Sequence, residues 1–367
     1  MSNSEKITVI LADDSSVIRR ALSIMLETDP NIEIVASASD GKSAASLAKI
    51  KKPDILILDV EMPVMDGITA LPEILKNSPN TKVIMCSSLT EKGADTSIKA
   101  MALGAVECLV KPTGAEAAKP DSPFKKKLIH TVKTLVPLKS EPSVAQSKTS
   151  ASARSLPSQA PVKKDAEVTL RDDTSAYKGK PDILAIGSST GGPKALFQVL
   201  KDIGILDIPI VITQHMPATF TKILAEHLTQ QTGIPAHEGE EGMVVQKGNV
   251  YVAPGGKHML FEKQGIQLKI NLNDGPQENF CKPAVDPMMR SIVDIYGNKV
   301  LGLILTGMGS DGAKGSQYLV DKGGRVIAQD EETSVVWGMP RAVAEAGICS
   351  EILPIQNIGS WVKKACV

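Results

Sequence analysis

Two spacings of hydrophobic residues alternate between positions 7 and 110 of the chain. Short apolar runs of strand length are separated by longer stretches in which apolar residues recur with the period of a helix. Between the first two runs, Ile18, Leu22 and Met25 fall on one helical face, and Asp14 or Ser15 precedes them as a capping residue. This alternation is typical of a parallel sheet covered by helices. It predicts five strands, at 7–12, 32–36, 55–58, 83–86 and 106–110.

The alternation stops after a last expected helix at 123–135 and resumes at residue 181. The segment between is rich in Ser, Ala, Pro and Lys and has few bulky apolar residues, so it cannot form a core and is expected to be a flexible linker. We therefore predict an α/β fold of two doubly wound domains, at 1–137 and 181–367, joined by a linker at 138–180. The first has a five-stranded parallel sheet, and the second is larger and mainly parallel. Its predicted strands are 183–187, 208–213, 250–253, 300–305 and 325–328.

Composition and charge narrow the class of protein. The 367 residues exceed what one hydrophobic core usually supports, and 41 basic residues balance 41 acidic ones, so no overall basic field favours nucleic acid or a membrane surface. The five cysteines are scattered without a CxxC pair, which argues against a disulfide framework and against a zinc site. No apolar run approaches the roughly 20 residues that span a bilayer, and the first residues lack a signal-peptide core. We expect a cytoplasmic monomer that binds no nucleic acid and does not insert into a membrane.

Polar side chains stand where the strands of the first domain end. Asp13 and Asp14 follow the first strand, Asp59 the third, Ser87 the fourth and Lys111 the fifth. Because the carboxyl ends of parallel strands line one crevice, these five side chains are expected to converge. Three neighbouring carboxylates need a cation, and hard oxygen ligands suit Mg²⁺. The lysine and the hydroxyl would complete a site for a phosphoryl group.

In the second domain a glycine-rich turn follows the first predicted strand. Gly187, Ser189 and Gly191 occupy the fixed positions of GxSxG, the strand–turn–helix motif that presents a nucleophilic serine. The alternative is a βα turn without chemistry. The choice of Ser189 rather than the adjacent Ser188 as the nucleophile rests on this spacing together with a family resemblance.

A serine nucleophile needs a base and an orienting carboxylate. His215 follows the predicted strand at 208–213, so it lies at a strand end as Ser189 does, and Asp311 follows the strand at 300–305 in another glycine-rich turn. The other histidines fit less well, since they are expected in the first domain, on a helix surface or in loops: His130, His227, His237 and His258.

A dinucleotide site is the rival interpretation of the turn around Asp311. Gly307, Gly309 and Gly312 satisfy GxGxxG, and Asp330 follows at about the distance of a ribose-binding carboxylate. That interpretation assigns no role to Ser189 or His215. A hydrolase would use the residues at all three strand ends, Ser189, His215 and Asp311.

The first domain resembles the receiver domains of two-component response regulators. The resemblance rests on Ala12-Asp13-Asp14, on Leu58 to Pro63, on Met65-Asp66-Gly67 and on Lys111-Pro112. It implies a flavodoxin-like fold, Asp59 as phosphoacceptor, Mg²⁺ held by Asp13, Asp14 and Asp59, and Ser87 and Lys111 as readers of the phosphoryl group. Cys108 stands three residues before Lys111, where the simplest regulators have an aromatic that changes rotamer, so the resemblance does not carry an aromatic switch over to this chain.

The second domain resembles the CheB protein-glutamate methylesterases of bacterial chemotaxis. Its order of Ser, His and Asp differs from that of α/β hydrolases. The resemblance implies hydrolysis of γ-glutamyl methyl esters and deamidation of glutamine, without a metal, by Ser189, His215 and Asp311, with the Met308 amide as oxyanion donor. The matching motifs are 186–193, 214–217, 251–255, 305–312 and 337–340, whereas 280–283 departs from the histidine- and arginine-containing version.

The two resemblances together imply a regulated enzyme. The substrate would be a chemoreceptor, and the phosphodonor a chemotaxis histidine kinase. We expect the unphosphorylated receiver to cover the Ser189 cleft and phosphorylation to uncover it. A receptor-binding adaptor without catalysis, gated in the same way, is the alternative.

Overall fold

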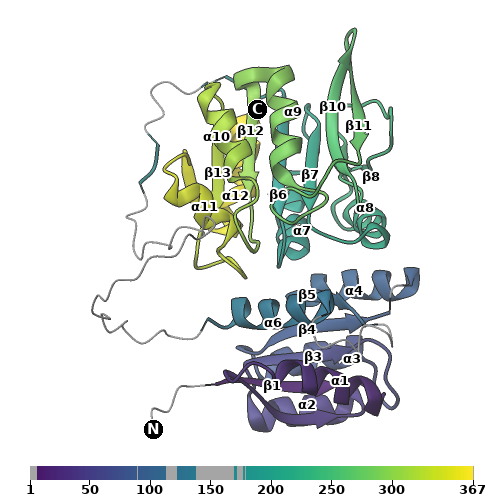
Figure 1. The fold of residues 1–367 in the computed structure, drawn as a ribbon. Coiled ribbons are helices and arrows are strands. Elements are labelled where there is room, and N and C mark those ends of the chain that lie inside the picture. The colour runs from purple at the N-terminus through teal and green to yellow at the C-terminus, as the bar shows by residue number, and fades with distance from the viewer. Residues whose placement is uncertain are drawn as a thin grey trace, which may run out of the picture.

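The computed structural model describes residues 6–88, 90–112, 122–137, 169–171, 177 and 179–366. Most of the linker predicted at 138–180 therefore lies outside the described residues. Figure 1 shows two α/β parts, one built from the chain up to α6 and the other from β6 onward. No helix in the described part of the chain is long and apolar enough to cross a membrane.

The first part contains a five-stranded parallel sheet in the order β2-β1-β3-β4-β5. Its strands are buried along most of their length because helices cover both faces, which explains why they read as continuous apolar runs. All five predicted strands are confirmed, with small changes at their ends. The strands are β1 (Ile7–Ala12), β2 (Ile32–Ala38), β3 (Ile55–Asp59), β4 (Lys82–Ser87) and β5 (Glu107–Val110).

A side-chain cap begins each helix of this part. The hydroxyl or carboxylate of the capping residue accepts a hydrogen bond from the third helical N–H, which has no partner inside its helix. For the first helix, the capping residue is Ser15 rather than Asp14. The helices are α1 (Ser16–Leu26), α2 (Gly41–Lys51), α3 (Gly67–Asn77), α4 (Glu91–Leu103) and α6 (Pro123–Leu135), and the caps are Ser15, Asp40, Asp66, Thr90 and Ser122.

The second part contains a seven-stranded sheet in the order β14-β13-β12-β6-β7-β9-β8, and every pair in it is parallel. Its strands are β6 (Ile183–Ser188), β7 (Ile210–Gln214), β8 (Ala236–Glu238), β9 (Val250–Val252), β12 (Val300–Ile304), β13 (Arg325–Gln329) and β14 (Glu351–Leu353). Helices cover it: α7 (Gly192–Ile203), α8 (Ala218–Thr232), α9 (Val285–Tyr296), α10 (Ala313–Asp321), α11 (Met339–Glu345) and α12 (Ile355–Cys366). A 3-10 turn, η2 (Gly297–Lys299), precedes β12.

An antiparallel hairpin outside this sheet was not predicted from the sequence. It consists of β10 (His258–Gln264) and β11 (Gln267–Asn273), and it projects at the upper right of Figure 1. In β11, Leu268 and Ile270 are buried, whereas Gln267 is exposed and Lys269 is only partly buried. Such a half-exposed strand alternates in polarity, so a search for continuous apolar runs does not detect it.

The central strands β12, β6 and β7 are neighbours in register. Gly187 pairs with Thr213 on one side and with Ile304 on the other. The turns that follow these strands therefore meet at one edge of the sheet, which is where open α/β sheets bind ligands.

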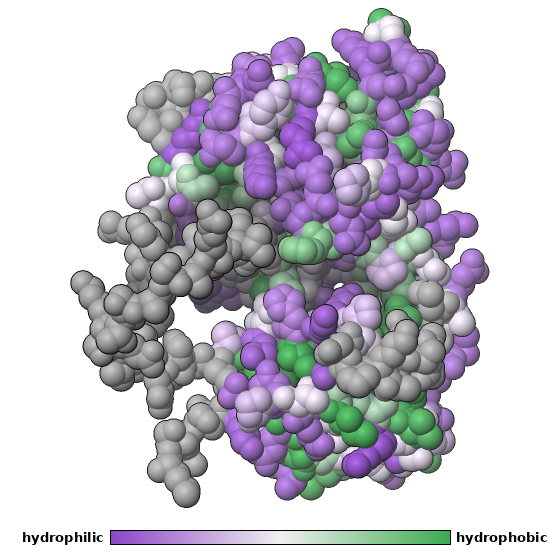
Figure 2. Space-filling model, in the orientation of Figure 1, coloured by the Kyte–Doolittle hydropathy of each residue, from purple (hydrophilic) through white to green (hydrophobic). Residues whose placement is uncertain are grey.

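Helix α4 joins the two parts. It contacts both α7 and α8, and apolar residues from the two parts belong to one hydrophobic cluster. In Figure 1, α4, β5 and α6 lie on the side of the first part that faces the second. The face of the molecule in Figure 2 is largely hydrophilic, with hydrophobic residues scattered over both parts.

Candidate active site and phosphoryl site

The turn after β6 separates the two adjacent serines. Ser188 is fully buried at the end of the strand, and its hydroxyl donates to Gln214 Oε1 at 2.7 Å. Ser189 is half-buried, and no hydrogen bond between described residues uses its hydroxyl. A side chain at Gly192 would collide with Gln214, since an added Cβ would lie 2.0 Å from Oε1. Of the two serines, only Ser189 has a hydroxyl available for chemistry.

Backbone contacts hold Ser189 against the turns after β7 and β12. The Ser189 N–H donates to the Thr306 carbonyl at 3.0 Å, and the His215 N–H donates to the Ser188 carbonyl at 3.1 Å. A Cβ on Gly307 would lie 2.9 Å from Ser189 Cβ, so a larger residue would displace the serine. The structure thus brings together the strand ends that carry Ser189, His215 and Asp311, as predicted.

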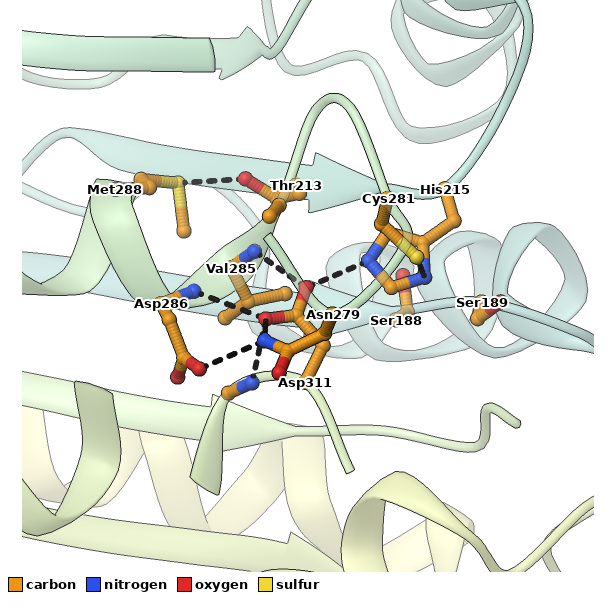
Figure 3. A network of polar contacts seen from close by, with 12 residues as sticks. Ser188, Ser189, Thr213, His215, Asn279, Cys281, Val285, Asp286, Met288 and Asp311 are labelled. Atoms are coloured by element: carbon orange, nitrogen blue, oxygen red, sulfur yellow. Dashed lines mark hydrogen bonds and ion pairs between the residues drawn. The ribbon is translucent and has the colours of Figure 1, made fainter. Parts of the chain in front are cut away.

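His215 and Asp311 form a close pair (Figure 3). His215 Nε2 lies 2.7 Å from Asp311 Oδ2. A carboxylate can only accept, so Nε2 carries a hydrogen and Nδ1 is the nitrogen available to take a proton. Both side chains are largely buried, with 12% of His215 and 2% of Asp311 exposed, so solvent screens the pair weakly.

Asp311 also serves as the cap of α9. Ala284 precedes that helix and offers no capping side chain, and Asp311 instead accepts from the N–H groups of Val285 and Asp286 at 2.6 and 3.2 Å. Burial alone would raise the pKa of Asp311, but the hydrogen bond with His215, its charge and these two N–H groups lower it. The helix terminus keeps the carboxylate ionised beside the histidine.

Asn279 is a member of this network that the sequence did not reveal. Its amide nitrogen donates to Asp311 Oδ1 at 2.7 Å and to Asp286 Oδ2 at 2.8 Å, bridging two buried carboxylates (Figure 3). Burial raises the pKa of Asp286, with Asp311 adding to the effect. Only its position six residues before the α9 terminus could have drawn attention to Asn279.

His215 Nδ1 faces the sulfur of Cys281. The Sγ–Nδ1 distance is 3.5 Å, and no hydrogen bond among the described residues joins His215 to Ser189. Burial would lower the pKa of His215, but the contacts with Asp311 and Cys281 outweigh it and raise the pKa to about 9. At neutral pH the imidazole of this resting arrangement is therefore largely protonated.

Met308 follows Gly307 in the turn that packs on Ser189. No hydrogen bond between described residues uses its backbone N–H, which leaves that group free to receive an acceptor. Its side chain packs into the hydrophobic cluster of the first part, with Val335.

Three expectations about the other histidines were wrong. His227 is buried rather than on the surface, because α4 covers its helix, and its Nε2 lies 2.7 Å from Asp95 Oδ1. His258 is the first residue of β10 and His237 lies in β8, so neither is in a loop.

The hydrogen bonds of Asp330 argue against the dinucleotide site that was the rival interpretation. Its carboxylate caps a local turn by accepting from the N–H of Thr333 at 3.0 Å and from the Thr333 hydroxyl. In addition, Gly307 pairs with Trp337 in an isolated parallel bridge. The glycine-rich turn is thus packed against other segments of the second part.

The polar residues at the strand ends of the first part converge as expected. Asp13, Asp14 and Asp59 each offer a carboxylate oxygen, and these atoms lie within 4.8 Å of one another. Lys111 Nζ lies 2.8 Å from Asp13 Oδ2 and 2.7 Å from Asp59 Oδ2. Apart from this lysine, those two buried oxygens have no hydrogen-bond partner among the described residues. This all-oxygen donor set fits Mg²⁺.

Burial also affects the expected phosphoacceptor. It raises the pKa of Asp59 to about 6, with Asp13 adding to the effect and Lys111 opposing it. The Ser87 hydroxyl lies 2.9 Å from the Ser97 hydroxyl on α4 and 3.7 Å from Cys108 Sγ. The serine expected to read the phosphoryl group is thus bonded to the helix that contacts the second part.

The first part touches the serine turn directly. The Thr190 hydroxyl donates to Glu107 Oε2 at 2.5 Å, and the Gly191 N–H donates to the Val106 carbonyl at 3.1 Å. Both acceptors lie at or beside β5, and both donors follow Ser189 at once. A movement of β5 would therefore change the hydrogen bonds of the two residues that directly follow Ser189.

These features define a class of protein in which a response-regulator receiver is joined to a domain with a serine, a histidine and an aspartate at its strand ends. The response regulator receiver domain model matches residues 9–119, and the CheB methylesterase model matches residues 184–362. The chain belongs to the CheB methylesterase family.

Similar proteins cover nearly the whole chain. One from Rhodospirillum rubrum, named protein-glutamate methylesterase/protein-glutamine glutaminase 1, is 44% identical over 98% of this chain and 95% of its own length. One from Azospirillum brasilense, named protein-glutamate methylesterase/protein-glutamine glutaminase, is 47% identical over 99% of this chain and 93% of its own. The crystal structure of the Thermotoga maritima CheB methylesterase catalytic domain is 39% identical, covering 51% of this chain and 99% of that one, with a TM-score of 0.48.

Proposed function

We propose that this protein hydrolyses γ-methyl esters of glutamate on chemoreceptors, and that it deamidates receptor glutamines at the same site. The names of the relatives support both activities. The observation that carries the proposal is the His215–Asp311 pair, whose Nε2 and Oδ2 atoms lie 2.7 Å apart. The two residues come from two turns, and each turn is hydrogen-bonded to the turn that carries the half-buried Ser189. We also propose domain boundaries at 1–137 and 181–367, with 138–180 as linker.

In the proposed reaction Ser189 Oγ attacks the ester carbonyl, and its proton passes to His215 Nδ1. Asp311 holds the hydrogen on Nε2, which keeps the imidazole in the tautomer that can accept this proton. The oxyanion accepts from the Met308 N–H, a donor of a kind worth about 3–4 kcal/mol in the transition state. His215 then protonates the departing methanol, and water, deprotonated by the same nitrogen, releases glutamate and frees Ser189. For glutamine the leaving group is ammonia.

Control is proposed to come from phosphorylation of Asp59 by a chemotaxis histidine kinase. Mg²⁺, held by Asp13, Asp14 and Asp59, would neutralise charge as the phosphoryl group arrives. Ser87 and Lys111 would then contact the phosphoryl oxygens. The new group would carry about −1.5 to −2 charges and strong acceptor oxygens, and it would draw the Ser87 hydroxyl from its present partner Ser97.

In the unphosphorylated state the receiver is proposed to hold the serine turn closed. The Thr190 hydroxyl is bonded to Glu107, and the Gly191 N–H is bonded to the Val106 carbonyl. The contact between Asp95 and His227 joins α4 to α8. Phosphorylation would loosen this face and expose the Ser189 cleft to the receptor.

A fluorophosphonate, which reacts with activated serine hydroxyls, tests the proposed nucleophile. The full chain should be labelled, Ser189→Ala should lose labelling, and the neighbouring Ser188→Ala is the matched control that retains it. Equal labelling of wild type and Ser189→Ala would exclude Ser189. Failure of all three to react would favour the adaptor without catalysis.

A further inference from the structure

Cys281 completes a thiol–imidazole–carboxylate line in the second part. Its sulfur lies 3.5 Å from His215 Nδ1, and His215 Nε2 is held at 2.7 Å by Asp311 (Figure 3). A nucleophile beside a base that a carboxylate orients is the arrangement that activates serine and cysteine in enzymes. In this resting structure the position next to the base belongs to Cys281 rather than Ser189.

The loop around Cys281 holds the thiol in place. Paired backbone hydrogen bonds join Glu278 and Cys281, at 2.9 and 3.2 Å. Arg290 clamps both carboxylate oxygens of Glu278, at 2.7 and 2.9 Å, and Asn279 ties the loop to Asp311. The thiol is thereby positioned by a bonded framework connected to the His215–Asp311 pair.

The other four cysteines lack such a partner and are poor nucleophiles. Cys86 and Cys349 are buried, and burial raises the pKa of both thiols. Burial also raises the pKa of Cys108 to about 11 and that of Cys366 to about 11. Because the thiolate is the reactive form, these four cysteines should react slowly at neutral pH.

We propose that Cys281 is an activated thiol that shares the base His215 with Ser189 and is a site of modification by small soft electrophiles. With iodoacetamide as the probe, Cys281 Sγ forms a bond to the methylene carbon, and iodide leaves with the bonding electrons. The thiol proton is taken up by Nδ1 in the fraction of molecules whose His215 is neutral, and it passes from there to solvent. The added group would lie against Nδ1 and block the transfer from Ser189. Ester hydrolysis would stop although Ser189 is unchanged.

The structure also implies competition before any modification. Cys281 occupies the face of the imidazole that Ser189 must use, and its contact stabilises the protonated histidine. Replacing Cys281 by Ala should therefore increase hydrolysis at neutral pH, because the neutral base becomes more available. The ester-hydrolysis readouts rest on the proposed function, whereas the rate of alkylation does not.

The test measures alkylation of the full chain by mass spectrometry alongside methanol release from methylated receptors. We expect Cys281 to react at least about tenfold faster than Cys366, and activity to fall at the same rate. His215→Ala and His215→Gln should both remove the preference for Cys281, which a merely accessible thiol would not show. Cys366→Ala is the control and should be inactivated as wild type is.

Each outcome decides between the possibilities. Equal alkylation of Cys281 and Cys366, or a preference that survives both His215 variants, would overturn the proposal. Loss of hydrolysis in Cys281→Ala with retention in Ser189→Ala would overturn it too, because Cys281 would then be the nucleophile. Selective alkylation by a protein that releases no methanol would support the activated thiol and reject the proposed function.

Discussion

Asp311 has two tasks at the scale of single residues, because it both orients His215 and caps α9. Position at a strand end predicted Asp311 and His215 from the sequence, and the GxSxG spacing predicted Ser189. Asn279 and Cys281 could not be predicted in the same way, since they come from a loop whose path depends on tertiary contacts with Asp311 and Arg290. Their residue types carry no spacing signal of their own.

Asn279→Ala should lower kcat about fivefold to tenfold with little change in KM, as expected for loss of about 1 kcal/mol of hydrogen bonding. The bridge between Asp311 and Asp286 would be lost, so His215 would be oriented less well. Steady-state methanol release measures both constants. Asn249→Ala is the control, because among the described residues the Asn249 side chain bonds only the nearby Lys247 carbonyl. A rise in KM at constant kcat would contradict an orienting role.

Activity should rise with pH to about 9. His215 accepts a proton only when neutral, and its pKa in the resting structure is raised to about 9, so the active fraction grows as pH approaches that value. The pH profile of kcat/KM measures this midpoint in the free enzyme. Cys281→Ala should move the midpoint down, toward the ordinary value of histidine. A wild-type midpoint below 6.5 would contradict the arrangement of His215, Asp311 and Cys281.

At the scale of elements, buried strands and capped helices were predictable because each is a local pattern. The β10–β11 hairpin was missed because its strands are half exposed. The burial of His227 was missed because it depends on α4 packing against α8, a contact between segments far apart in the chain. The contact of α4 with α7 and α8 is therefore a feature that no local pattern of the sequence predicts.

Ser97→Ala should raise the activity of the unphosphorylated protein about twofold to tenfold. Its hydroxyl holds Ser87 in the resting position at 2.9 Å, and such a bond is worth about 0.5–1.5 kcal/mol. The fully phosphorylated rate should not change. Thr96→Ala is the control, because in the described part of the chain the Thr96 hydroxyl bonds only the Lys92 carbonyl within α4. Unaltered resting activity in Ser97→Ala would show that Ser87 is not coupled to α4 by this contact.

At the scale of the whole molecule, the receiver contacts the serine turn through β5 and contacts α8 through α4. Glu107→Ala removes the acceptor of Thr190, so the resting rate should increase while the phosphorylated rate stays the same. Methanol release before and after addition of a phosphodonor measures both rates. Glu33→Ala, on the far edge strand β2 of the same sheet, is a suitable control. A lower resting rate in Glu107→Ala would mean that the contact assists catalysis.

The central claim is that Asp59 phosphorylation controls ester hydrolysis by Ser189. The most direct measurement is methanol release from methylated chemoreceptors by the full chain, with Mg²⁺, in the presence and absence of a small-molecule phosphodonor. We predict that the phosphodonor accelerates the wild-type protein, has no effect on Asp59→Ala, and yields no release from Ser189→Ala. Methanol release by Ser189→Ala at the wild-type rate would contradict the account. So would an Asp59→Ala variant that the phosphodonor accelerates as much as the wild-type protein.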